Sequence, residues 1–196
     1  MELIARRFEV YPATSSAFGA LRPLLERCDE VRFSGRIAET NSNQVTLDFD
    51  DRLRDAFCGQ GATETELSLP DGVAKEYDFA FDFAGHRVAV EVEKANREKI
   101  LYDILKCHMY LSGDVAFALL VLPKNYPHRH GEWDLFATGV ARYRHCLDFG
   151  FGTPETFDRI LVVGYEQATA DGERLTGQVR SRLIAGRPSA TAREHA

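Results

Sequence analysis

Three carboxylates, Asp78, Glu91 and Glu93, lie where the alternation of polar and apolar residues predicts two β-strands. The strands cover residues 76–84 and 87–93, and their other faces carry Phe and Val side chains that must belong to a core. Carboxylate oxygens are the ligands that Mg²⁺ prefers in proteins. The pattern therefore predicts a metal site on the polar face of a hairpin.

A turn at Gly85-His86 would join these strands in antiparallel register. The opposed pairs would be Asp78 with Glu93, Ala80 with Glu91, and Asp82 with Ala89. Opposed side chains lie about 5 Å apart and diagonal neighbours about 7–8 Å apart, so the carboxylates would repel one another. A positive charge is expected between them, and a divalent cation is the simplest candidate. The alternative is an ordinary solvated face, but no lysine or arginine stands opposite the acids.

The composition indicates one domain. The chain has 196 residues, of which 44% are hydrophobic and 11% aromatic, enough for a substantial core. We expect a single domain over residues 1–167 and a polar, flexible C-terminal tail over residues 168–196. The net charge of −6 argues against a nonspecific nucleic-acid coat protein. Residues 47–91 contain eleven acidic and four basic residues, and such an acidic centre suits a metal-dependent site.

Membrane and secretory signals are not recognised in the sequence. The longest apolar run, Val115 to Leu122, has the length of a strand and is too short to span a bilayer. The four cysteines are far apart and lack the CxxC spacing of a zinc site, so we expect reduced thiols. These features predict a cytoplasmic protein that does not act at a membrane.

The order of the expected elements gives the carboxylates a context. A helix over residues 44–57 precedes a strand over residues 64–69, the hairpin, a helix over residues 97–111 and a buried strand over residues 115–122. With Asp78 on the second strand and Glu91-Val92-Glu93 on the third, this stretch resembles the PD-(D/E)xK nuclease superfamily. It resembles more closely the BamHI/BglII-type restriction endonucleases, in which Glu or Gln replaces the lysine of the motif. The resemblance covers roughly residues 44–122.

The resemblance implies an α/β fold with a restriction-endonuclease-like αβββαβ core, whose mixed central sheet is flanked by helices. It also implies metal-dependent hydrolysis of DNA. Asp78 and Glu91 would hold Mg²⁺, for which Mn²⁺ can substitute, and Glu93 would hold a second metal or orient the attacking water. A lysine could come from elsewhere, with Lys94 and Lys106 as the two candidates. Glu64 or Glu66 of the preceding strand could add an acidic ligand.

DNA contacts are expected from residues near this site. Lys124, His128 and Arg129 lie on a predicted loop over residues 123–134, and Asn96 begins the predicted helix after Glu93. Basic and aromatic side chains of this kind contact phosphates and bases. A plain surface loop held by its prolines is an equally good interpretation of residues 123–134.

Three functions remain open from the sequence. The first is a restriction or phage-defence endonuclease acting on double-stranded DNA, which would be a homodimer because a palindromic site needs two active sites. The second is a nicking, repair or RNA-cleaving nuclease. The third is a non-catalytic α/β DNA-binding or regulatory protein with a degenerate nuclease motif, as Glu93 in place of the lysine would indicate.

Overall fold

A mixed eight-stranded sheet forms the centre of the computed structural model, which describes residues 1–37, 44–67, 77–128 and 131–185. Its strands lie in the order β3-β2-β1-β10-β7-β6-β5-β4, and β6, β7 and β10 run parallel to one another. The other neighbours are antiparallel. The strands are β1 (Glu2–Tyr11), β2 (Glu30–Ile37), β3 (Gln44–Thr46), β4 (Thr63–Glu64), β5 (Phe79–Phe83), β6 (His86–Val92), β7 (Phe117–Pro123) and β10 (Ile160–Thr169).

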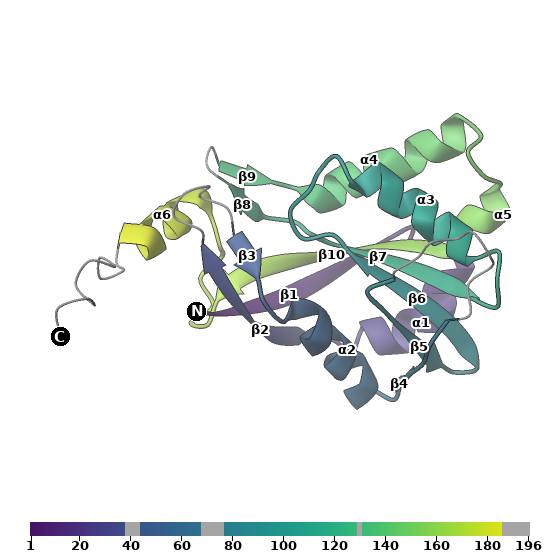
Figure 1. The fold of residues 1–196 in the computed structure, drawn as a ribbon, viewed down its shortest axis with the longest axis horizontal. Coiled ribbons are helices and arrows are strands. Elements are labelled where there is room, and N and C mark those ends of the chain that lie inside the picture. The colour runs from purple at the N-terminus through teal and green to yellow at the C-terminus, as the bar shows by residue number, and fades with distance from the viewer. Residues whose placement is uncertain (38–43, 68–76, 129–130, 186–196) are drawn as a thin grey trace.

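Helices cover both faces of the sheet, with α1 and α2 on one face and α3, α4 and α5 on the other (Figure 1). A separate hairpin, β8–β9, and helix α6 lie together at one end (Figure 1). The α/β class and the mixed sheet flanked by helices, which the sequence predicts, are confirmed. The bounds are α1 (Ser16–Leu25), α2 (Phe49–Gly59), α3 (Ile100–Tyr110), α4 (Leu135–Asp148), α5 (Pro154–Phe157), α6 (Gly177–Ala185), β8 (Tyr126–His128) and β9 (Gly131–Trp133).

Each face of the sheet has its own hydrophobic core. Phe79 and Phe81 of β5 pack with Phe57 of α2, and the three valines of β6 belong to this same core. On the other face the small side chain of Ala89 lies among Ile104 and other residues of α3 and α4. Strand alternation thus sends Glu91, two residues after Ala89, to the α3 side of the sheet.

The turn of the hairpin differs from the predicted one. Ala84 and Gly85 join β5 to β6, and both have positive φ angles, 49° and 80°. Two such residues make the type I′ turn, whose twist matches that of the strands. The predicted turn at Gly85-His86 is therefore wrong, and each partner moves by two residues, which keeps every side chain on its predicted face. The observed pairs are Phe79 with Val90, Ala80 with Ala89, Phe81 with Val88, Asp82 with Arg87, and Phe83 with His86.

Strand β2 and the β8–β9 hairpin are not predicted from the sequence. Gly35 lies in β2, where a Cβ atom would be 2.7 Å from Leu3 Cδ1. The predicted loop over residues 123–134 contains β8 and β9. Asn125 fixes this segment, because its buried Nδ2 donates to the carbonyls of Gln167 and Leu175 at 2.8 and 2.9 Å.

Two boundaries also differ. The helix predicted over residues 44–57 is strand β3 followed by α2. The predicted end of the domain at residue 167 falls inside β10, and the polar segment after it forms α6, with Leu175 and Val179 buried. Residues 186–196 lie outside the described residues.

Within the described parts of the chain, no helix has the length and apolar character needed to cross a membrane. The four cysteines are free thiols, and Cys28, Cys107 and Cys146 are buried. Burial raises the pKa of the Cys28 thiol to about 12, with a further rise from Asp29. Burial also raises the pKa of the Cys107 and Cys146 thiols, so these three buried thiols are protonated at neutral pH.

Candidate active site

The candidate site lies where β6 ends beneath helix α3. Glu91 is only 2% exposed, and both of its carboxylate oxygens accept hydrogen bonds from α3. Lys106 Nζ lies 2.6 Å from Oε2, and the Tyr110 hydroxyl lies 2.5 Å from Oε1. Lys106 and Tyr110 are four residues apart on the helix, so both face the same point of the sheet. The positive charge expected near the acids is thus at least in part a lysine of this chain.

The electrostatics of Glu91 reflect opposing influences. Burial is the largest of them and raises the pKa of its carboxyl. The hydrogen bonds from Lys106 and Tyr110 lower this pKa, and the negative charge of Asp78 raises it; the net shift is upward. The pKa of Tyr110 is also raised, by burial and by Glu91, so this hydroxyl remains a donor.

Asp78 lies close enough to Glu91 for its charge to raise the pKa of the Glu91 carboxyl. It immediately precedes β5 and is exposed. Its backbone N–H donates to the Val90 carbonyl at 3.0 Å, and its Oδ2 accepts from the Val92 N–H at 2.6 Å. Asp78 is therefore fixed against the segment of β6 that carries Glu91, not opposite Glu93 as predicted.

Glu93 has a different environment from the other two acids. Its Oε1 accepts from the backbone N–H groups of Ala95 and Asn96, both at 2.8 Å, and its Oε2 lies 3.5 Å from Lys99 Nζ. The carboxylate thus closes the turn between β6 and α3. Asn96, predicted to bind DNA, is exposed and accepts from the N–H groups of Glu98 and Lys99 at 3.1 and 3.3 Å. Its side-chain oxygen therefore stabilises the turn that leads into α3.

Of the two candidate lysines, Lys106 reaches the carboxylate pair and Lys94 pairs with Asp50 of α2. Asp50 was not predicted as a site residue, because it is one of eleven acidic residues between positions 47 and 91 and no motif distinguishes it. Its Oδ1 is buried without a hydrogen-bond partner in the described structure. Burial raises the pKa of Asp50, Lys94 lowers it, and Asp78 raises it again. Asp50 therefore lies close enough to Asp78 for their charges to interact.

Among the described residues, the other predicted ones form no hydrogen bond or ion pair with Asp78 or Glu91. Glu66 is exposed beyond the end of β4, and Glu64 lies 3.4 Å from Arg54 of α2. Lys124 forms an ion pair with Glu9. The ring of His128 lies 4.2 Å from that of Trp133 in the β8–β9 hairpin. Arg129 lies outside the described residues.

Asp103 of α3 is a second residue that the sequence analysis missed. It is fully buried, and Lys99 Nζ lies 3.3 Å from its Oδ1. Neither oxygen has a hydrogen-bond partner within the described residues. Burial raises the pKa of Asp103 from 3.8 to about 6, although Lys99 opposes this shift. The pattern of apolar residues in the predicted helix did not indicate that the side chain of Asp103 faces the core.

We expect Asp103→Asn to stabilise the protein at neutral pH. Because the folded pKa is raised, the folded state binds more protons than the unfolded state between the two pKa values. The unfolding free energy of the wild type therefore falls as pH rises from about 4 to about 6. The variant has no ionisable group at this position and avoids this loss. A pKa shift of about two units corresponds to up to about 3 kcal/mol of unfolding free energy. Urea denaturation at about pH 7.5 and about pH 4 should show a gain only at the higher value.

Asp55→Asn is the matched control, since Asp55 also lies on a helix but its side chain is 62% exposed. Its unfolding free energy should stay within about 0.5 kcal/mol of wild type at both pH values. An equal gain in unfolding free energy in both variants, or a gain for Asp103→Asn that persists at low pH, would show that the raised pKa of Asp103 is not the cause.

The site thus brings Asp78, Glu91 and Lys106 together, with Asp50 near Asp78. The carboxylate of Glu93 instead binds backbone N–H groups of the turn between β6 and α3. In the parts of the chain that are described, no group of three or more His, Cys, Asp or Glu side chains has a spacing that could hold a metal ion. Any metal would therefore be bound by fewer side chains or after a local rearrangement. Comparison of the chain with models of known protein families and with curated proteins finds no match.

Proposed function

We propose that the chain is a Mg²⁺-dependent endonuclease that hydrolyses phosphodiester bonds of double-stranded DNA, of the restriction or phage-defence kind. The contact between Glu91 and Lys106, with Asp78 beside it, carries the proposal. Two carboxylates and a lysine form the site of the resembled superfamily, and here α3 would supply the lysine. The order α2, β4, β5, β6, α3, β7, with β4 to β7 as successive neighbours in the sheet, supports the same proposal.

The donor atoms suit a hard cation. Mg²⁺ is bound in proteins through one or two carboxylates and keeps several waters. Asp78 and Glu91 would supply the carboxylates, and the Val92 carbonyl a third oxygen. Asp50 Oδ1, a buried acceptor without a hydrogen bond in the described structure, is a further oxygen near Asp78. When bound, Mg²⁺ would lower the pKa of a water molecule and neutralise charge that develops on the phosphate.

The other residues would act around this pair. Lys106 would place a positive charge where negative charge develops on the phosphoryl oxygens. Tyr110 would hold Glu91 in position through its hydroxyl. Glu93, through its two bonds to backbone N–H groups, would fix the start of α3 and hence Lys106. A cut in each strand of a palindrome would need a second copy of the chain related by a two-fold axis.

One observation favours a non-catalytic alternative. Glu91 is almost fully buried, and both of its oxygens already accept hydrogen bonds. A purely structural ion pair would look the same. In that case the chain would be a DNA-binding or regulatory protein that keeps the nuclease-like order of elements.

Incubation of the purified protein with supercoiled plasmid and mixed phage DNA separates these functions. We expect nicked and linear plasmid with Mg²⁺ and none with EDTA, and discrete fragments from the phage DNA. A smear would indicate a nuclease without sequence preference. Absence of cleavage with Mg²⁺ and with Mn²⁺ on every DNA would contradict the proposal and favour the non-catalytic alternative.

A further inference from the structure

A groove runs between strand β1 and helix α4, on the face of the sheet that also carries Glu91. Its volume is about 640 Å³, which lies within the range of ligand-binding clefts. Four residues of α4 that share one side of the helix form a wall of the groove: Ala137, Val140, Ala141 and Arg144. Because the first three are small and apolar, a ligand can approach the helix closely there, next to the guanidinium.

Arg144 is held in place over the groove by Tyr11 of β1, which also lines it. The Arg144 Nε donates to the Tyr11 hydroxyl at 2.9 Å, and the guanidinium carbon lies 4.9 Å from the centre of the ring. The Tyr11 ring packs edge-on against the buried Tyr143 of α4, with 5.4 Å between the ring centres. A guanidinium has five N–H donors, of which Nε carries one, so the four on the Nη atoms point to no acceptor within the described residues.

The other charged side chains that line the groove already have partners. Lys124 forms an ion pair with Glu9. Asp134 accepts from the Ala137 N–H at 2.7 Å, so its charge is offset by the N-terminus of α4. In the described part of the chain, Arg144 forms no ion pair with a carboxylate. The groove therefore presents its positive charge at Arg144.

The donors at this end of the groove suit a phosphodiester. A guanidinium with free N–H groups binds two oxygens of a phosphate at once. The Tyr11 hydroxyl accepts from Arg144 and keeps its own O–H to donate to the same anion. The sugar carbons of a phosphodiester chain would lie against the wall formed by Ala137, Val140 and Ala141. An inorganic phosphate ion would use the donors but not this apolar wall.

Strand register relates the groove to the candidate active site. Glu91 lies in register with Leu120 of β7, and Leu120 lies in register with Val162 of β10. Val162 lies in register with Tyr11, and all four side chains are on the α4 side of the sheet. Three strand spacings, roughly 14 Å, thus separate Glu91 from Tyr11. That distance corresponds to about four nucleotides along a DNA strand, so DNA at Glu91 could also reach Arg144.

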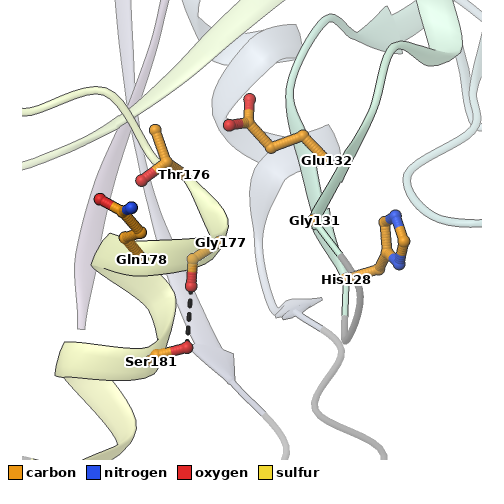
Figure 2. A pocket seen from close by; sticks show the side chains of 7 residues that line it. All are labelled: His128, Gly131, Glu132, Thr176, Gly177, Gln178 and Ser181. Carbon is orange, nitrogen blue, oxygen red and sulfur yellow. Dashed lines mark hydrogen bonds between the residues drawn. The ribbon is translucent and has the colours of Figure 1, made fainter.

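The cavity between α6 and the β8–β9 hairpin has a similar volume, about 680 Å³, but different chemistry (Figure 2). The described residues that line it include no lysine or arginine. Its carboxylate, Glu132, forms an ion pair with Arg174 at 2.6 Å, and the Ser181 hydroxyl donates to the Gly177 carbonyl at 2.9 Å. This cavity therefore suits a phosphate group less well than the groove at Arg144.

We propose that the groove between β1 and α4 binds the phosphodiester backbone of the DNA that enters the candidate site, with Arg144 as the phosphate ligand and Tyr11 as a second donor. The phosphate chemistry follows from the free N–H groups of Arg144. The assignment of the phosphate to DNA rests on the proposed endonuclease function. Inorganic phosphate could satisfy the same donors, so the experiments separate the two sources.

Fluorescence anisotropy of a labelled DNA duplex in EDTA measures binding without cleavage. Arg144→Gln should raise the dissociation constant by about tenfold, through the loss of hydrogen bonds from a charged group, and lower the salt slope by about one. Arg142→Gln is the matched control, because Arg142 lies on the same helix and also forms no ion pair within the described residues, but does not line the groove. This control should bind DNA within about twofold of wild type.

Tyr11→Phe distinguishes an oriented site from general attraction between charges. The variant keeps the ring packing against Tyr143 and every charge of the protein, but it loses the hydroxyl that holds Arg144. We expect about threefold weaker DNA binding, the effect of one hydrogen bond, with an unchanged salt slope. All three variants should melt close to the wild-type temperature, which excludes a folding defect as the cause.

Thermal unfolding in inorganic phosphate, compared with chloride at equal ionic strength, tests the free anion. A rise in melting temperature that requires Arg144, together with normal DNA binding by Arg144→Gln, would assign the groove to a free phosphate compound. That result would overturn the DNA source.

The outcomes of the binding experiments are distinct. Weaker binding by Arg144→Gln and Tyr11→Phe, with normal binding by Arg142→Gln, supports the inference. Equal losses in the two arginine variants with none in Tyr11→Phe would indicate general electrostatic attraction and overturn it, as would wild-type binding by all three variants. Absence of DNA binding by the wild type would also overturn it.

Failure of this inference differs from failure of the proposed function. Plasmid cleavage by the wild type, with equal DNA binding and equal cleavage by Arg144→Gln, would overturn the groove assignment and retain the endonuclease function. DNA binding that depends on Arg144 and Tyr11, in a protein that cleaves no DNA, would refute the endonuclease function and support the groove as a DNA-binding site.

Discussion

Asp78→Asn is expected to slow Mg²⁺-dependent cleavage of plasmid DNA by about 10³-fold, the loss typical of removing a major electrostatic contact at an active site. Asparagine has the size of aspartate, and its side-chain oxygen can still accept from the Val92 N–H. The fold should therefore survive while one of the two negative ligands is lost. The measurement is the initial rate of plasmid nicking at saturating Mg²⁺.

Asp82→Asn is the control for this variant. Asp82 lies on β5 on the same face of the hairpin, but it pairs with Arg87 at 3.2 Å and its side chain is 45% exposed. Its rate of nicking should stay within about twofold of wild type, as expected for a surface substitution outside the site. Equal loss in both variants, or a wild-type rate for Asp78→Asn, would refute the role given to Asp78.

Lys106→Met is expected to have the largest effect on stability, a loss of about 3–5 kcal/mol at neutral pH, as found when one partner of a buried pair is removed. Without Lys106, the buried Glu91 keeps the hydrogen bond from Tyr110 but loses the lysine that lowers its pKa, so its folded pKa rises further above the unfolded value. The loss relative to wild type should therefore grow as pH rises above the raised folded pKa that Glu91 has in the wild type, and it should be smallest at low pH, where Glu91 is protonated in the folded and unfolded states of both proteins. Urea denaturation over a range of pH measures it.

The double variant Lys106→Met/Glu91→Met provides the comparison. Removing both charges leaves apolar side chains of similar volume, and such replacements are often neutral or stabilising. The double variant should regain most of the stability lost in the single one. Equal instability in both, or a loss that does not depend on pH, would show that Lys106 contributes through packing and not through Glu91.

The faces of the hairpin could be predicted from the sequence, but its register could not. Alternation alone assigns Phe79 and Phe81 to a core and Glu91 to the opposite face, and the structure confirms this. The register depends on whether Ala84 adopts positive φ, which is unusual for a residue other than glycine. Because Ala84 is not a glycine, its positive φ angle and the strand pairing that follows from it could not be predicted.

Contacts between separate elements were the least predictable part of the site. Nothing in the sequence distinguishes Lys106, which reaches Glu91, from Lys94, which reaches Asp50; only the packing of α2 and α3 on opposite faces does. The expected repulsion among the acids was a useful clue, since it predicted a positive charge. The repulsion alone favoured a divalent cation, and Lys106 became a candidate for this charge only through the resemblance to the nuclease superfamily.

If Asp78 and Glu91 form a metal site, the protein should bind Mn²⁺, and this test needs no knowledge of the preferred DNA sequence. Electron paramagnetic resonance of free Mn²⁺ during titration gives the affinity and stoichiometry directly. We expect wild type and Asp82→Asn to bind Mn²⁺ with the same affinity, and Asp78→Asn to bind it at least about tenfold more weakly, as loss of a charged ligand implies. Equal binding by Asp78→Asn and wild type, or no binding by any of the three, would contradict the account.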